Sequence, residues 1–140
     1  LLNYVQEYKG SHLIRTREQS VLDTLDIVID VGGQYDFEKR RFDHHQRGFQ
    51  EFYDPEGNFG RVKLSASGLV FKHFGEEIIR NSVASLFEES RMLGPEFRKV
   101  MEEKQVKALC RKMYDRYFQY LDGKDNGQNR IPKNTKVLYR

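Results

Sequence analysis

The chain has 140 residues, the size of one domain, and 38% of them are apolar, enough for one modest core. Its sequence holds no apolar run of about 18 residues, which excludes a membrane-spanning helix, and its single cysteine excludes a disulfide framework. A formal net charge of +3 favours anionic partners without distinguishing among nucleic acid, nucleotide and phosphate.

The first predicted element is the end of a helix, because apolar residues recur at helical spacing before Gly10, a candidate C-cap. A short strand is predicted over residues 12–16, and a turn or short helix over residues 17–25. The β-branched run at residues 26–31 is typical of a strand buried on both faces.

A short hairpin is predicted over residues 35–42, and residues 46–63 form a loop that is long enough to be functional. A helix capped by Ser65 or Ser67 follows this loop. Apolar residues at helical spacing then mark a second helix over residues 79–87.

The longest predicted helix runs from about residue 96 to residue 121, and a strand begins near residue 135. Cys110 on this helix and His73 on the first one are interpreted as structural residues. Strands followed by packed helices, with one buried strand of the parallel type, predict an α/β domain. Because both termini fall inside predicted elements, we expect the chain to be an excerpt of a longer polypeptide.

Three groups of residues carry candidate chemistry, and the first is Asp30. A carboxylate at the carboxyl end of an apolar strand stands where open α/β sheets bind ligands. Gly32 and Gly33 follow it and allow a bound group to approach the backbone closely. The plainer interpretation is an aspartate that ends a strand and caps a turn.

The second group is Asp43-His44-His45, in which carboxylate and imidazole stand side by side. Such a set of nitrogen and oxygen donors suits Mn²⁺, Fe²⁺ or Zn²⁺. Because side chains alternate along an extended segment, we expect one histidine to ligate while its neighbour meets substrate, with Asp43 orienting an imidazole. The alternative is a polar loop that follows the basic run at residues 39–41.

The third group is the pair Asp122 and Asp125, placed just past the long predicted helix. Acidic residues after a helix are commonly solvated, so the pair alone indicates little. The order of the three groups along the chain is more informative. An aspartate at the end of a strand comes first, Asp-His-His comes second, and a distant aspartate after a helix comes third.

This order resembles the DHH phosphoesterase superfamily, and the local strings are similar to its branch named after the melanocyte proliferating gene. The family usually has Ser-Ser-Ala-Gly where this chain has Ser-Ala-Ser-Gly at residues 65–68. The string Asp-His-His-Gln-Arg-Gly-Phe is highly specific, and the resemblance spans nearly the whole chain. It rests on the strings at residues 26–36, 41–49, 63–75 and 121–127.

The resemblance implies a three-layer domain in which helices flank a mainly parallel sheet. It also implies hydrolysis of phosphodiesters with two divalent cations, Mn²⁺ or Mg²⁺, that stabilise the attacking and leaving oxygens. Asp30 would bridge both cations and His44 would ligate one of them. Either Asp122 or Asp125 would complete the ligands of that cation, and the sequence does not separate the two.

The same resemblance implies that His45 contacts the scissile phosphate and that Asp43 supports it, which makes these two the catalytic residues. Further substrate contacts are predicted at Arg47, Arg61 and Lys63. Each of these three also fits a solvated or structural loop.

The family's first motif, a His-rich stretch with acidic ligands on the first strand, lies upstream of the position of Leu1. Its second domain lies beyond the position of Arg140. Residues 1–140 are therefore interpreted as a partial catalytic domain that lacks its N-terminal strand. We expect this chain to be inactive or nearly so, and the full-length protein to be active.

The leading functional prediction, with its substrate taken from the resemblance, is a 3′–5′ exonuclease acting on RNA or single-stranded nucleic acid. The resemblance also implies a location inside the cell, in the nucleus or mitochondrion. One alternative is a hydrolase of small phosphate compounds such as pyrophosphate or short oligonucleotides. Another is a non-catalytic module that binds nucleic acid or a partner chain. An exposed sheet edge left by a missing strand also predicts pairing into a homodimer.

Overall fold

The computed structural model describes residues 1–55, 62–89 and 101–128 of the chain. Its elements follow one another in the order η1 (Leu2–Tyr4), η2 (Gln6–Tyr8), α1 (Gln19–Leu22), β1 (Val28–Ile29), β2 (Tyr35–Asp36), β3 (Arg41–Phe42), α2 (Ala66–Glu89), α3 (Glu103–Met113), η4 (Tyr114–Phe118) and α4 (Gln119–Asp125). The elements η1 and η2 are 3₁₀ turns, and η4 is a π-helical turn. The mixture of strands and helices confirms the predicted α/β class.

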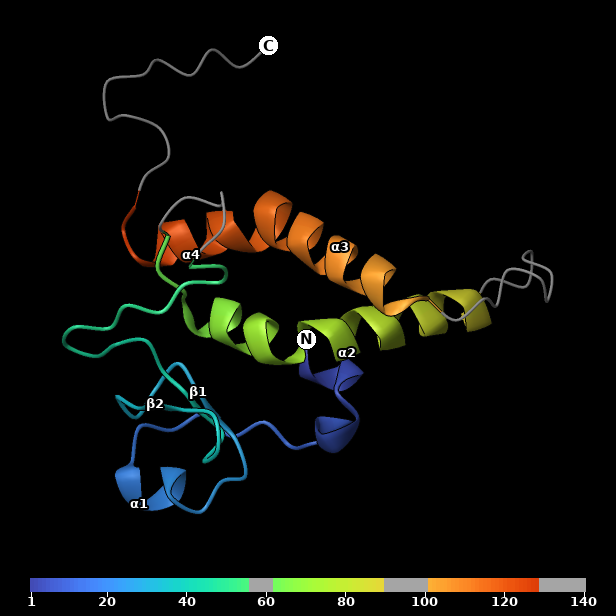
Figure 1. The fold of residues 1–140 in the computed structure, drawn as a ribbon. Helices are drawn as coiled ribbons and strands as arrows, with labels where there is room; N and C mark the ends of the chain where they lie inside the picture. Colours follow the sequence, from blue (N-terminus) through green and yellow to red (C-terminus); the bar gives the residue numbers. More distant parts are fainter. Residues whose placement is uncertain (56–61, 90–100, 129–140) are drawn as a thin grey trace, which may run out of the picture.

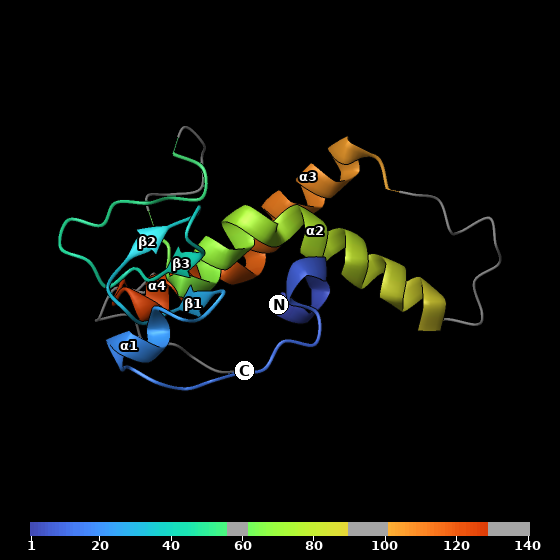
Figure 2. The same ribbon diagram turned by 90° about the horizontal axis from the view of Figure 1, so that it is seen from below.

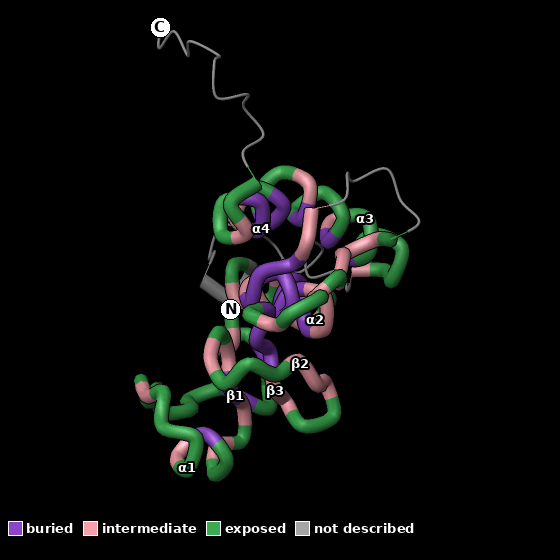
Figure 3. The backbone as a smooth tube through the Cα atoms, turned by 90° about the vertical axis from the view of Figure 1, so that its left-hand side faces the viewer, coloured by how far each residue is buried: buried purple, intermediate pink, exposed green. Residues whose placement is uncertain are grey.

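Helix α2 lies at the centre of the described structure, with the small sheet on one side and the α3–η4–α4 segment on the other (Figure 1). Seen from below, the sheet lies near the beginning of α2, and the N-terminal turns lie beside its middle (Figure 2). Buried residues concentrate on α2 and on the helix faces that pack against it (Figure 3). The fully buried core includes Val5, Phe42, Leu64, Leu69, Phe71, Val106 and Tyr114.

The sheet has three strands in the order β1-β3-β2. Strand β3 pairs in parallel with β1, where Ile29 faces Phe42, and antiparallel with β2, where Tyr35 faces Phe42. The predicted hairpin at residues 35–42 and a strand within residues 26–31 are therefore confirmed. The sheet formed by the described residues is mixed rather than mainly parallel, and the DHH-type three-layer arrangement and the homodimer stay predictions.

The N-terminal segment differs from its prediction. Residues 2–8 form 3₁₀ turns instead of the end of an α-helix, and the segment 12–16 forms no strand within the described part of the chain. The side chain of Leu13 is 83% exposed. A strand is stable only when a neighbour completes its hydrogen-bond ladder, and no described segment pairs with residues 12–16.

Helix α2 is one continuous helix where two were predicted. Gly75 interrupts the apolar pattern in the sequence, but it does not end the helix, and a Cβ there would lie 3.3 Å from the Phe71 ring. Ser65 precedes the helix, and its Oγ accepts a hydrogen bond from the backbone N–H of Gly68 at 3.4 Å. Ser65 is therefore the capping residue of the two candidates.

The C-terminal helical segment extends further than predicted. Its described part begins with a capping box between Glu102 and Gln105, passes through η4 and ends at Asp125. Gly127, with φ of 67°, follows this end. Asp122 and Asp125 thus lie on a helix and not in the turn after it. Residues 96–100 and the strand predicted near residue 135 lie outside the described residues, and none of the described helices meets the requirements of a membrane span.

His73 lies inside an aromatic cluster between α2 and the hairpin. Its Nε2 lies 2.7 Å from the Tyr35 hydroxyl, and its ring stacks on Phe37 with centroids 4.2 Å apart. Burial lowers the pKa of His73 below its usual value, and the nearby Lys72 charge lowers it further. This placement agrees with the structural role predicted for the residue.

We expect the lowered pKa of His73 to make the free energy of unfolding depend on pH. The contribution of His73 should reach its full value above about pH 6.5 and decrease as the pH falls below that value. The reason is that the unfolded chain takes up a proton on His73 at a higher pH than the folded chain does. Urea unfolding of the wild type and of His73→Gln between pH 5 and pH 8 measures this contribution as the difference between the two curves. Parallel curves would contradict it.

Candidate metal centre

Four of the predicted site residues meet at one edge of the sheet. Asp30, Asp43, His44 and His45 each offer one ligand atom, and these atoms all lie within 4.8 Å of one another. Asp30 directly follows β1 and Asp43 directly follows β3. Because these two strands are parallel neighbours, their carboxyl ends share one edge, where α/β sheets bind ligands.

Asp30 is held in an uncommon backbone conformation, with φ of 66°. Its backbone N–H donates to the carbonyl oxygen of Phe42 at 3.1 Å, which fixes the residue to the end of the ladder. Its side chain is more than half exposed, and Oδ1 lies 3.6 Å from Nδ1 of His44 and 3.9 Å from Nδ1 of His45. The carboxylate therefore faces both histidines and solvent.

Asp43 is buried and supports His45. It accepts hydrogen bonds from the N–H of Gly33 at 2.7 Å, from the N–H of His45 at 3.0 Å and from Nδ1 of His45 at 2.7 Å. Burial acts to raise the pKa of Asp43, but these hydrogen bonds outweigh it and lower the pKa below its usual value. The carboxylate therefore stays ionised and orients the imidazole.

His45 presents its ring to solvent while Asp43 holds its Nδ1. The hydrogen bond to Asp43 raises the pKa of His45 above its usual value. Burial opposes this shift, and the charges of Asp43, Asp30 and Asp125 add to it. An imidazolium is therefore favoured here, with Nε2 as the ring nitrogen that Asp43 does not engage.

His44 lies between two carboxylates. Its side chain is only 5% exposed, with Nδ1 3.6 Å from Asp30 Oδ1 and Nε2 3.3 Å from Asp125 Oδ2. Nδ1 is buried and hydrogen-bonds to none of the described residues, which is unusual for a buried polar atom. Imidazole nitrogen and carboxylate oxygen are donor types that suit a divalent cation such as Mn²⁺, so the donors gathered around His44 fit the predicted metal.

The two aspartates of α4 have different surroundings. Asp125 is exposed at the end of the helix and faces His44. Asp122, one turn earlier, is fully buried, and Ser65 and Tyr114 donate hydrogen bonds to it. Burial raises the pKa of Asp122, against hydrogen bonds from Ser65 and Tyr114 that lower it. The structure thus brings Asp125 to the cluster and Asp122 to the beginning of α2.

The basic residues that were predicted to contact substrate are not part of the cluster of Asp30, Asp43, His44 and His45. Arg47 is exposed two residues after His45, and Lys63 is half-buried beside α4, where its carbonyl oxygen accepts a hydrogen bond from Asn126 at 2.9 Å. Arg61 lies outside the described residues. Their contacts with substrate stay a prediction.

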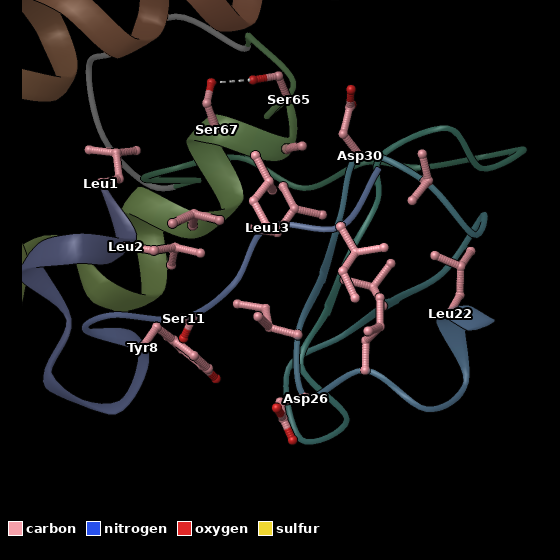
Figure 4. Close-up of a pocket in the computed structure, with 18 of the residues that line it drawn as sticks. Leu1, Leu2, Tyr8, Ser11, Leu13, Leu22, Asp26, Asp30, Ser65 and Ser67 are labelled. Atoms are coloured by element: carbon pink, nitrogen blue, oxygen red, sulfur yellow. Dashed lines mark hydrogen bonds between the residues drawn. The ribbon is translucent and has the colours of Figure 1, made fainter. Parts of the chain in front are cut away.

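An apolar groove of about 1330 Å³ reaches Asp30, which is the one residue of the cluster among those that line it (Figure 4). The N-terminal turns, the segment after them, β1 and the beginning of α2 line it, and Asp30, Ser65 and Ser67 lie at one end. The sequence analysis missed this groove because its walls come from segments that are distant in the chain and share no motif.

Comparison with known proteins relates the whole chain to one family. Residues 1–140 match the family described as MYG1_exonuc, uncharacterised protein family UPF0160. The chain is 37% identical over 140 residues to the MYG1 protein of Dictyostelium discoideum and 33% identical over 140 residues to the MYG1 protein C694.04c of Schizosaccharomyces pombe. It is 36% identical over 129 residues to the MYG1 exonuclease of Homo sapiens.

The chain spans only about a third of the length of these relatives. All of it aligns with 37% of the Dictyostelium protein and 38% of the fission yeast protein, and 91% of it aligns with 31% of the human protein. The prediction that it is an excerpt of a longer polypeptide agrees with these shares. No solved structure matches the chain.

Proposed function

Since the chain belongs to the MYG1_exonuc family, uncharacterised protein family UPF0160, we propose that it is part of a metal-dependent nuclease. The substrate would be RNA or single-stranded nucleic acid, degraded in the 3′–5′ direction. Mammalian relatives named MYG1 exonuclease support the reaction class. The observation that carries the proposal is the position of His44, buried between the carboxylates of Asp30 and Asp125.

Asp30, His44 and Asp125 would hold a divalent cation, Mn²⁺ or Mg²⁺. When bound, such a cation polarises a phosphodiester and lowers the pKa of a water molecule enough to make it a nucleophile. The three residues come from the end of β1, the segment after β3 and the end of α4. Only the folded chain therefore assembles the site.

His45 would bind a non-bridging oxygen of the scissile phosphate through Nε2. The hydrogen bond from Nδ1 to Asp43 fixes the ring and favours the protonated form, which complements an anionic phosphate. Asp43 is buried and already accepts three hydrogen bonds, so its part is to orient His45. Arg47 would add a charge near the phosphate backbone.

We further propose that a second cation and the complete active site need polypeptide beyond these 140 residues. Asp30, His44 and Asp125 account for one metal position among the described residues, and the relatives are about three times as long as the chain. The chain alone is accordingly expected to bind metal without degrading nucleic acid.

Calorimetric titration of the chain with Mn²⁺ tests the metal site. We expect His44→Ala to weaken Mn²⁺ binding by more than about 100-fold, because loss of residues that merely orient ligands already costs about 10–100-fold. His12→Ala is the matched control, since His12 is exposed and not part of the cluster. Equal affinities for the wild type and His44→Ala, or no binding to the wild type, would overturn the proposal.

A further inference from the structure

Helix α4 carries a second carboxylate, Asp122, which is bound by Ser65 and Tyr114 and has no role in the proposed metal site. Asp122 is 0% exposed. Its Oδ1 accepts hydrogen bonds from the N–H of Ser65 at 3.0 Å and from the Ser65 hydroxyl at 2.6 Å, and its Oδ2 accepts one from the Tyr114 hydroxyl at 2.9 Å. Each carboxylate oxygen is therefore held by a named donor.

The beginning of α2 is shaped around this carboxylate. A Cβ placed on Gly68 would overlap both oxygens of Asp122, so glycine is what allows the first turn of α2 to approach so closely. The amino-terminal end of a 24-residue helix carries a partial positive charge, which favours a nearby carboxylate. Asp122 on α4 supplies this carboxylate to the beginning of α2.

Two contacts fasten α4 to the segment that leads into α2, and they lie on either side of Asp125 in the sequence. Asp122 binds Ser65. The side-chain amide of Asn126 donates to the carbonyl oxygens of Lys63 and of Asp122, each at 2.9 Å. Asp125 lies between Asp122 and Asn126, and its Oδ2 is 3.3 Å from Nε2 of His44.

We propose that Asp122 is a positioning residue, which locks the first turn of α2 to α4 and so holds Asp125 against His44. This inference rests on the proposed function, in which Asp125 is a metal ligand. The inference gives different roles to Asp122 and Asp125, the two acidic residues of the Leu-Asp-Gly-Lys-Asp string. A ligand acts on the cation directly, whereas Asp122 acts only through Asp125.

A double-mutant cycle on Mn²⁺ affinity tests this assignment. We expect Asp122→Asn to weaken Mn²⁺ binding by about 10-fold in the wild-type background, as loss of a ligand-orienting partner does. In an Asp125→Ala background, the same substitution is expected to change the affinity little, because its effect passes through Asp125. Asp115→Asn, on the same helical segment and partly exposed, is the control and should bind as the wild type does.

Affinities are to be measured where every variant is fully folded by circular dichroism, so that a residue that only stabilises the fold would leave the affinity unchanged. Tyr114→Phe removes one of the three hydrogen bonds to Asp122 and serves if Asp122→Asn does not fold. The ¹⁵N resonances of the His44 ring, recorded without metal, give a second readout and should shift in the same direction in Asp122→Asn and Asp125→Asn.

An equal loss of affinity in both backgrounds, or none in the wild-type background, would overturn the positioning role while leaving the metal site intact. A wild-type chain that binds no Mn²⁺ would overturn the proposed function and this inference with it. Unshifted His44 resonances in Asp122→Asn would separately show that Asp122 does not set the surroundings of His44.

Discussion

Replacing Phe42 by alanine is expected to lower the free energy of unfolding by about 3–5 kcal/mol, the usual cost of deleting a buried phenylalanine ring. Phe42 is fully buried on β3, the central strand. The centroid of its ring lies 6.4 Å from the ring centroid of Phe37, 5.9 Å from that of Phe74 and 5.7 Å from that of His73. It therefore joins the sheet to α2, and its loss leaves a cavity at that junction.

Urea unfolding followed by circular dichroism measures this effect. Small domains have a total stability of about 5–15 kcal/mol, so the Phe42→Ala chain should show a much lower unfolding midpoint. Tyr117→Ala is the control, because that aromatic ring is more than half exposed and should matter by about 0.5 kcal/mol or less. Equal midpoints for the two variants would show that the junction does not depend on Phe42.

Gly68→Ala is expected to destabilise the chain by about 2–5 kcal/mol, combining the cost of overpacking with that of a disturbed buried hydrogen bond. The new Cβ would overlap the Asp122 carboxylate, which is fully buried and cannot move into solvent. Helix propensity alone predicts the opposite sign, because alanine is favoured over glycine within a helix by about 1 kcal/mol.

Gly75→Ala provides the matched control for Gly68→Ala. It lies in the same helix, but its Cβ would meet the Phe71 ring at 3.3 Å, a contact that a small shift of the ring relieves. We expect it to change the free energy of unfolding by less than about 1 kcal/mol. If Gly68→Ala unfolds at the same urea concentration as Gly75→Ala or at a higher one, the close contact with Asp122 is not a constraint.

The parts of the fold that were predicted correctly depend on local signals. The β-branched run before Asp30 predicts its strand, the polar turn at residues 36–40 predicts the hairpin, and the candidate caps Ser65 and Ser67 predict the beginning of α2. The failures depend on distant partners. Residues 12–16 have strand composition, but no described segment completes their ladder. Gly75 stays within one helix, on which Phe74 and Ile78 are both buried in the core.

The candidate site also has features that the sequence predicts and features that depend on how distant segments pack. Asp30 and Asp43-His44-His45 meet because β1 and β3 are parallel and end at one edge. The sequence pattern predicts both strands, but it does not predict that they pair with each other, and only the family resemblance placed these residues in one site. Which of Asp122 and Asp125 faces this edge depends on the register of α4. The π-helical turn η4 changes that register relative to an ideal helix, and no local sequence pattern predicts this turn. The contacts of Asp122 with Ser65 and Gly68 depend on how α4 packs against the beginning of α2, so no local sequence pattern predicts them either.

At Asp30 the backbone conformation favours glycine, whereas the candidate metal site needs a carboxylate at the same position. A residue with a Cβ in the left-handed region costs about 1–2 kcal/mol, a penalty that aspartate lessens and glycine escapes. The routine way to stabilise such a position is therefore to install glycine, which would remove the carboxylate that faces both histidines. A programme that improved this chain for thermal resistance alone would select against its own candidate metal site.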